Sequence, residues 1–332
     1  MSPHGWNPSE LEAISYGPAD MRPHVPGDDA AWQESFVVSW WDDDRGVGGF
    51  HRIGQEPAAG SASVLCGVVS TEGTRFRRTD EHVALSPAGT GPDVFEAGPH
   101  HRVRFSGGLS FEVDEPDCEM VLHFEDFYPA YNYWALTSDS LLSVDIAPDH
   151  YQIAGRVHGS LRLGDRELSV DGLGHRDHSW GVRHWTALVG HRWLAGTVGP
   201  PLSFSMITTH LATGQLSRVG LVVRDGEVAA LRDVDIVVHL EPDGLTHRGG
   251  TATARLPDGE ELAFEAETVD GVVTTIRGLT VVEGLGRIRV GEMTGFCDLE
   301  QSNNAEVRRG AEPLALRAVN EEGLSVRARQ GT

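Results

Sequence analysis

LVGHRWLAGTVGPPLSFSMITTHL, residues 188–211, contains two runs in which polar and apolar residues alternate. The runs at 188–199 and 202–211 flank the turn-forming residues Gly199, Pro200 and Pro201, so the stretch predicts two antiparallel strands joined by a hairpin. The same period of two extends outward in both directions, whereas the best helical candidate, 8–15, is short. Further strands are predicted at 35–41, 61–70, 101–107, 111–115, 120–127, 153–163, 218–226, 234–240, 251–256, 261–268, 272–278 and 286–300.

Turn signals separate these predicted strands. Glycine and proline account for 40 and 17 of the 332 residues, and dipeptides such as Asp225-Gly226 and Asp258-Gly259 lie between strands. Many short antiparallel strands at close spacing are typical of a sandwich or a barrel. The chain is long enough for one large barrel or for two packed barrels, and we expect an all-β protein with two.

Composition and charge exclude several classes of protein. No apolar run approaches the roughly 20 residues of a membrane helix, and the start MSPHGWNPSELEA has no basic and apolar signal region, so we expect neither stable membrane insertion nor secretion. The formal net charge of −22 repels nucleic acids and anionic lipids. The cysteines Cys66, Cys118 and Cys297 are odd in number, which argues against a disulfide framework and suits a cytoplasmic location. A homo-oligomer is compatible with the sequence.

Chemistry-bearing residues gather in DGLGHRDHSWGVRHW, residues 171–185, which holds three histidines, two aspartates, two arginines and two tryptophans. Such a mixture of ionisable and aromatic side chains is typical of a pocket wall. In a regular strand His175, Asp177 and Ser179 share one face, while Arg176, His178 and Trp180 share the other; bulges at the glycines would change that order. The sequence leaves open which face lines the pocket.

The segment GHRDHSWGVRHW resembles the Asp-His-x-Trp-Gly motif of the carotenoid hydratase and AttH-like superfamily, which includes kievitone-type hydratases and Diels-Alderase-like cyclases. WQESFVVSWW (32–41) and QIAGRVHGSLRL (152–163) are also similar to segments that precede this motif. The resemblance implies two tandem lipocalin-like, calycin-type β-barrels. We place the first at residues 1–165 and the second, with the motif near its start, at residues 166–332.

The resemblance also implies a cofactor-independent hydratase, or a dehydratase or cyclase, that protonates an alkene in an isoprenoid- or terpenoid-like apolar molecule. Asp177 matches the carboxylate of the motif and would be the acid, which requires a raised pKa. Arg176 is predicted to bind the substrate, although bonding of Arg176 to Asp177 would lower that pKa and oppose the role of Asp177 as the acid. His178 and His158 would orient the acid or water, and Glu300 could be a second acid or base. Aromatic faces for a cationic intermediate could come from Trp180, Trp185, Trp193, Tyr131, Tyr133 and Trp134.

Other interpretations remain beside this one. A non-catalytic lipocalin-like carrier of an apolar small molecule is the alternative, and Asp177 could be a structural carboxylate that bonds backbone amides at a bulge. A metal ion held by His175-x-Asp177-His178 is disfavoured because no further ligand pair lies at a telling distance. No phosphate-binding loop, nucleophile elbow or His-Glu-x-x-His motif is present, so no cofactor is expected.

Overall fold

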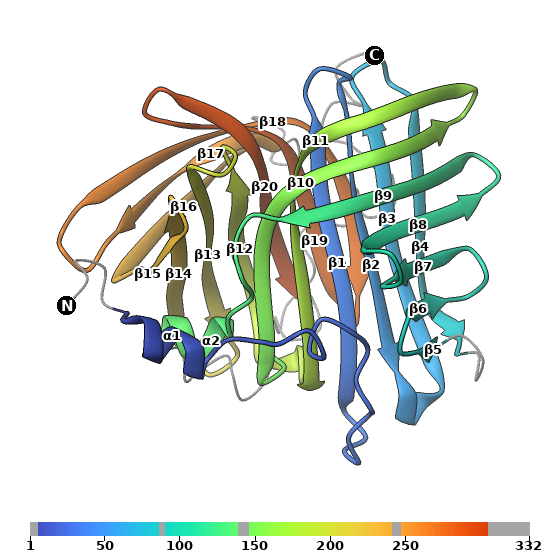
Figure 1. Cartoon of the computed structure of the whole chain (residues 1–332), viewed down its shortest axis with the longest axis horizontal. Helices are drawn as coiled ribbons and strands as arrows, with labels where there is room; N and C mark the ends of the chain where they lie inside the picture. The colour runs from blue at the N-terminus through green and yellow to red at the C-terminus, as the bar shows by residue number, and fades with distance from the viewer. Residues whose placement is uncertain (1–5, 86–89, 139–145, 241–246, 305–332) are drawn as a thin grey trace.

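The computed structural model of the chain describes residues 6–85, 90–138, 146–240 and 247–304. These residues form two curled antiparallel sheets that lie side by side (Figure 1), which confirms the all-β, lipocalin-like prediction. The first sheet contains β1 (Trp32–Asp42), β2 (Val47–Glu56), β3 (Ser61–Ser70), β4 (Arg75–Ala84), β5 (Thr90–Gly91), β6 (Val94–Ala97), β7 (His101–Arg104), β8 (Leu109–Glu115), β9 (Cys118–Asp126), β10 (Asp149–Leu163) and β11 (Arg166–Val182).

The second sheet contains β12 (Leu188–Thr197), β13 (Leu202–Leu211), β14 (Leu216–Arg224), β15 (Glu227–Ala230), β16 (Asp233–Leu240), β17 (His247–Arg255), β18 (Glu261–Ile276), β19 (Leu279–Val290) and β20 (Met293–Asn304). Most neighbours along the chain pair in both sheets, whereas β4 and β5, and β15 and β16, lie at opposite ends of their sheets. One long-range pairing joins the two halves of each sheet. In the first sheet β1 pairs with β11, and in the second β12 pairs with β20.

The chain passes from the first sheet to the second after the domain boundary that the sequence analysis places between residues 165 and 166. That boundary coincides with the hairpin between β10 and β11, and both of these strands belong to the first sheet. The chain passes to the second sheet between Val182 and Leu188, through the short 3-10 helix Trp185–Ala187. The motif-bearing stretch is therefore the last strand of the first sheet and the start of the connection to the second.

Alternating side chains fill two interiors and the layer between them. On β1, Phe36, Val38 and Trp40 enter the interior of the first sheet, whereas Val37 and Trp41 face the second sheet. Because both of its faces are covered, β1 is almost wholly buried, which explains its run of apolar residues. The second sheet encloses its own interior cluster, and residues of both sheets meet in the layer between them.

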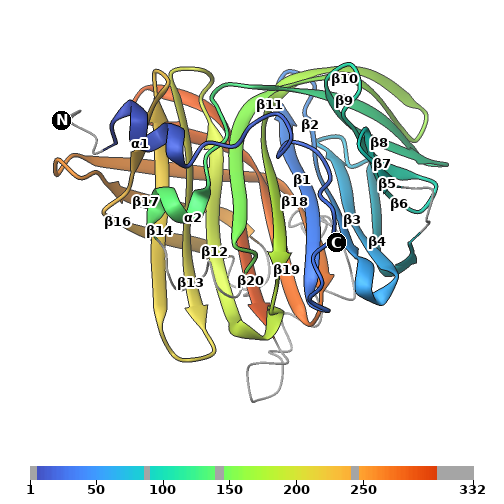
Figure 2. The same cartoon turned by 60° about the horizontal axis from the view of Figure 1, so that its bottom comes forward.

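The N-terminal segment covers part of the face of the first sheet that is turned away from the second sheet, the face that also carries Phe36 and Val38. Its helix α1 (Pro8–Ala13) lies near α2 (Tyr133–Thr137), and residues 15 and 131 form a β-bridge (Figure 2). The rings of Tyr16 and His24 pack on Trp180 of β11, with centroid separations of 5.0 and 4.0 Å. In the part of the chain that the structure describes, no helix has the length and apolar character needed to cross a membrane.

Candidate active site

A cavity of about 150 Å³ lies between the two sheets. One wall comes from β1, β2, β3, β10 and β11, the other from β12, β13, β18, β19 and β20, and α2 adds to the lining. Apolar side chains such as Val37, Leu65, Ile207 and Leu279 form much of the surface. An apolar cavity of roughly this volume can hold a benzene-sized molecule, so an aromatic ring or one isoprene unit fits inside.

Strand alternation on β11 decides which motif residues reach the cavity. Asp177 and Ser179 line it, as expected for side chains that share a face. Arg176 and His178 point to the opposite face, under the N-terminal segment. The register is continuous from Val182 to Leu173 against β1, so no bulge changes the order.

Asp177 is bonded to a histidine that the sequence analysis did not identify. Its carboxylate contacts Nε2 of His150 on β10, and the ring of His150 stacks on Tyr133 with a centroid separation of 5.6 Å. Gln152 lies 3.0 Å from the same ring nitrogen. These residues form one connected polar group on the wall contributed by the first sheet.

The pKa of Asp177 corrects the proposal that this residue is the acid. Burial raises the pKa, but the charges and hydrogen bond of His150 and the charge of Arg183 outweigh burial, so the pKa lies below its usual 3.8. A group with such a pKa is ionised at neutral pH and is a poor proton donor. Asp177 therefore fits the role of an anion that orients the ring of His150.

Two arginines also reach the cavity. Arg52 on β2 is buried and donates to Ser63 Oγ at 2.9 Å, and Arg183 lies over the ring of Trp185 at 4.9 Å. Burial lowers the pKa of Arg52 to about 9 and that of Arg183 to about 10, and both remain cations at neutral pH. The wall contributed by the first sheet therefore carries two guanidinium groups beside one carboxylate.

The opposite wall carries carboxyl groups. Glu283 of β19 and Glu300 of β20 are directly opposed in the ladder and both line the cavity, and Asp298 lies two pairs further along. Burial, followed by the charges of Glu300 and Asp298, raises the pKa of Glu283 well above 4.5. Burial and the charge of Glu300 raise the pKa of Asp298 to about 8. Like charges this close cannot all ionise, so this wall holds neutral carboxylic acids at pH 7.

Glu283 is the buried acid that the sequence analysis missed. Only 1% of its surface is exposed, and its Oε2 atom has no hydrogen-bond partner among the described residues. The carboxyl group of Glu300, by contrast, bonds to Nε2 of His191. Glu283 therefore combines a neutral carboxylic acid, a position on the cavity and an unpaired oxygen.

The remaining predicted residues divide between the cavity and other places. Those that line it, besides Asp177 and Glu300, are aromatic: Tyr133, Trp134, Trp185 and Trp193. Trp193 donates from Nε1 to Ser205 Oγ at 2.9 Å, and Trp134 donates to the carbonyl of Ala147 at 2.7 Å.

Five predicted residues do not line the cavity: Arg176, His178, His158, Trp180 and Tyr131. The guanidinium of Arg176 forms a salt bridge with Asp126 at 2.7 Å, which removes the predicted conflict with Asp177. His178 bonds to Glu34 at 2.9 Å and stacks on Phe36 at 3.8 Å, on the side of β11 that faces the interior of the first sheet.

His158, Trp180 and Tyr131 also lie outside the cavity. His158 lies on β10, with Nε2 3.3 Å from the carboxylate of Glu125, a pair far more exposed than the cavity residues. Trp180 is held under the ring of His24, and Tyr131 takes part in the bridge to the N-terminal segment. Trp180 and Tyr131 therefore have the surroundings of packing residues, and His158 has those of a surface residue.

Comparison with solved structures places the fold among known proteins. An AttH-like protein of Nitrosomonas europaea is similar with a TM-score of 0.61 at 11% identity, covering 88% of this chain and 97% of the other. Kievitone hydratase of Nectria haematococca gives 0.60 at 10%, covering 88% and 93%. CghA gives 0.58 at 13%, covering 85% and 93%. The resemblance inferred from the motif is thereby confirmed at the level of the fold.

Comparison by sequence defines the family. No curated protein matches the chain. A family model described as a domain of unknown function (DUF7064) matches residues 17–305, a span that includes both sheets and every residue of the cavity. The chain therefore belongs to the DUF7064 family.

Proposed function

We propose that the chain is a cofactor-independent hydratase, or a dehydratase or cyclase, that protonates a carbon–carbon double bond of an isoprenoid-like molecule in the cavity between the sheets. The observation that carries the proposal is Glu283, a buried carboxylic acid with a raised pKa on an otherwise largely apolar cavity. Such an acid keeps its proton at neutral pH and can deliver it to a substrate. The likeness in fold to a protein named as a hydratase supports the same reaction class.

In this mechanism the proton comes from one sheet and the water from the other. Glu283 donates its proton to the double bond, and a carbocation forms on the adjacent carbon. The rings of Trp193 and Tyr133 offer π-faces to that cation. A water molecule adds to the carbon and passes a proton to His150, whose imidazolium is stabilised by Asp177. Glu283 regains a proton from solvent and His150 releases one to solvent, so the net reaction is alkene plus water to alcohol.

The two arginines refine the substrate class. A purely hydrocarbon substrate would leave the charges of Arg52 and Arg183 facing an apolar surface, which is costly. We therefore propose a substrate that has a carbonyl, enolate or carboxylate oxygen at one end and an apolar, alkene-bearing part at the other. The oxygen would lie at the arginine wall and the double bond toward Glu283.

The second candidate is a carrier of an apolar ligand, which the largely apolar lining favours. The two candidates differ in what happens to a bound ligand. The protein is incubated in ¹⁸O-labelled water with prenyl alcohols and with prenyl carboxylic acids, and the products are analysed by mass spectrometry. Label in a new hydroxyl group, or a cyclised isomer, supports the enzyme. Tight binding of these compounds without any change in them would refute catalysis and support the carrier.

A further inference from the structure

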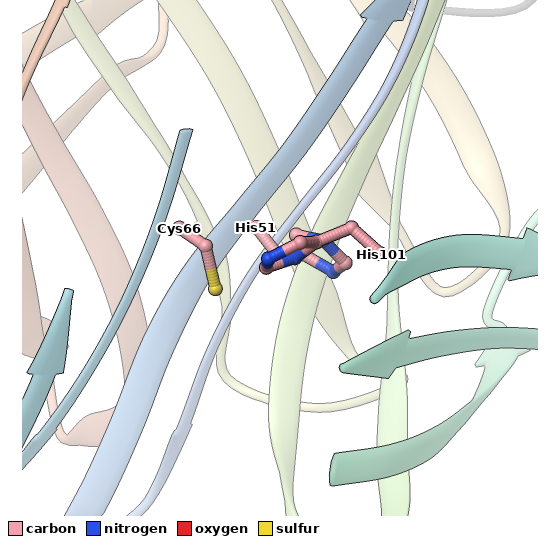
Figure 3. Close-up of side chains that lie close together, drawn as sticks. All are labelled: His51, Cys66 and His101. Carbon is pink, nitrogen blue, oxygen red and sulfur yellow. The ribbon is translucent and has the colours of Figure 1, made fainter. Parts of the chain in front are cut away.

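The interior of the first sheet contains a second group of chemistry-bearing residues. His51 of β2 and Cys66 of β3 are cross-strand partners, and they face away from the cavity, into the interior of the sheet. His101 of β7 reaches the same point from a strand that is not a neighbour of either one. Figure 3 shows the Cys66 thiol beside the two imidazole rings, and all three residues are at most 2% exposed.

The three side chains offer ligand atoms at metal-binding separations. One atom from each residue lies within 4.8 Å of the other two. Nδ1 of His101 and Nε2 of His51 are 3.2 Å apart. Two ligand atoms of a tetrahedral zinc site are separated by roughly 3.3–3.8 Å, given bonds of about 2.0–2.3 Å, so the imidazole pair already has nearly the required spacing. The Cys66 sulfur lies within 4.8 Å of both nitrogens, so it has to approach by at most roughly 1 Å.

Glu115, a neighbour of His101, is the kind of residue that usually accompanies a metal-binding histidine. The second ring nitrogen of His101 lies 3.3 Å from the carboxylate of Glu115, and a carboxylate bonded to the outer nitrogen is the usual partner of a metal-binding histidine. Glu115 is also the more exposed end of the group and offers a route for ions and protons from solvent.

We propose that His51, Cys66 and His101 bind one transition-metal ion of borderline softness, with zinc as the ion best matched to two imidazoles and a thiolate. On binding, the thiol of Cys66 forms the metal–sulfur bond and releases its proton to solvent, so one proton leaves for each ion. The ion fixes β7 to β2 and β3 across the interior of the sheet. Its site is separate from the cavity, because Arg52 and Leu65, the chain neighbours of His51 and Cys66, line the cavity from the other face.

A similar group, where the N-terminal segment meets the interior-facing side of β1 and β11, does not carry the same inference. Nitrogen and carboxylate atoms of His24, Glu34 and His178 also lie within 4.8 Å of one another. The carboxylate of Glu34, however, already accepts from the backbone and ring of His24 and from the ring of His178. These bonds use its oxygen atoms and attach the N-terminal segment to β1.

The test uses the full chain after treatment with a chelator. Co²⁺ is added as a spectroscopic probe, and the expected result is one ion per chain with a thiolate-to-cobalt charge-transfer band that Zn²⁺ abolishes. Zn²⁺ at a hundred times its dissociation constant should raise the melting temperature by roughly 4 °C. Cys66→Ser should remove the band and His101→Gln should weaken binding at least about 10–100-fold. Cys297→Ser, a buried cysteine of the second sheet, is the matched control and should keep the band.

The titration of the unmodified chain decides the proposal even if a variant fails to fold. Absence of the charge-transfer band at one equivalent of Co²⁺ would overturn it. So would a band that persists unchanged in folded Cys66→Ser, or ions bound without any thiolate band, since surface histidines would then be the ligands.

Discussion

Replacing Glu283 with glutamine tests the assignment of the acid most directly. Glutamine has nearly the shape of a neutral carboxylic acid but holds no transferable proton. Because Glu283 is neutral in the folded protein, the substitution should leave the cavity intact. General acid catalysis contributes typically about 10²–10⁴-fold, so kcat should fall by that order while ligand binding is retained.

The same substitution has a stability signature whose sign follows from the raised pKa. In the unfolded chain the carboxyl group ionises near 4.5, whereas in the folded protein it keeps its proton to a higher pH. The folded state therefore loses stability as the pH rises from 4.5 toward the folded pKa, by about 1.4 kcal/mol for each unit of the shift. Glu283→Gln removes this loss, so the variant should gain stability relative to the original chain as the pH increases from 5 to 8.

Two measurements complete this test. Turnover is followed by mass spectrometry with any substrate found in labelled water, and unfolding is followed by urea denaturation at pH 5 and pH 8. Glu292→Gln, at the exposed turn between β19 and β20, is the matched control and should change neither. Normal turnover in Glu283→Gln, or an unchanged pH dependence of stability, would refute the assignment.

Three further perturbations follow from the geometry. Asp177→Asn should destabilise the protein by about 3–5 kcal/mol at pH 7, because it leaves the buried charge of Arg183 without its anion; urea denaturation beside the exposed control Asp165→Asn measures this. Trp193→Phe should cost about 1–3 kcal/mol, because the hydroxyl of Ser205 loses the indole donor, and calorimetry would detect it. Gly249→Ala should destabilise by about 1–3 kcal/mol, since its φ is +120° and a Cβ would lie 2.0 Å from a backbone oxygen; an unchanged melting temperature would contradict the packing described for β17.

Much of the fold could be predicted because exposed and buried faces alternate along most strands. The hairpin at 188–211 is β12 and β13 within two residues. β2 was not predicted, because His51 and Arg52 occupy its two buried faces and its glycines remove further apolar signal. β11 was difficult for a related reason: one face lines a polar part of the cavity, and the other meets the N-terminal segment instead of an apolar core.

The site was predictable only in part, because the cavity is assembled from strands that are distant in the sequence. Asp177 and Glu300 could be identified as cavity residues, but the ionisation state of Asp177 depends on His150 and Arg183, which no local pattern connects with it. Glu283 did leave a signal. It is the single charged residue in the apolar run LTVVEGLG (279–286), and a charge in such a run is seldom placed there without a reason.

The pairing of β1 with β11 makes the order of synthesis important for this protein. Ser35 and Ser179 are partners across 144 positions of the chain. At typical ribosomal speeds of about 5–20 residues per second, β11 is synthesised roughly 7–30 s after β1. During that time one hydrogen-bonding edge of a strand that is almost wholly buried in the folded protein remains open to other chains. Aggregation during expression should therefore depend on the rate of translation between β1 and β11, and slower folding than in a helical protein of equal size is expected.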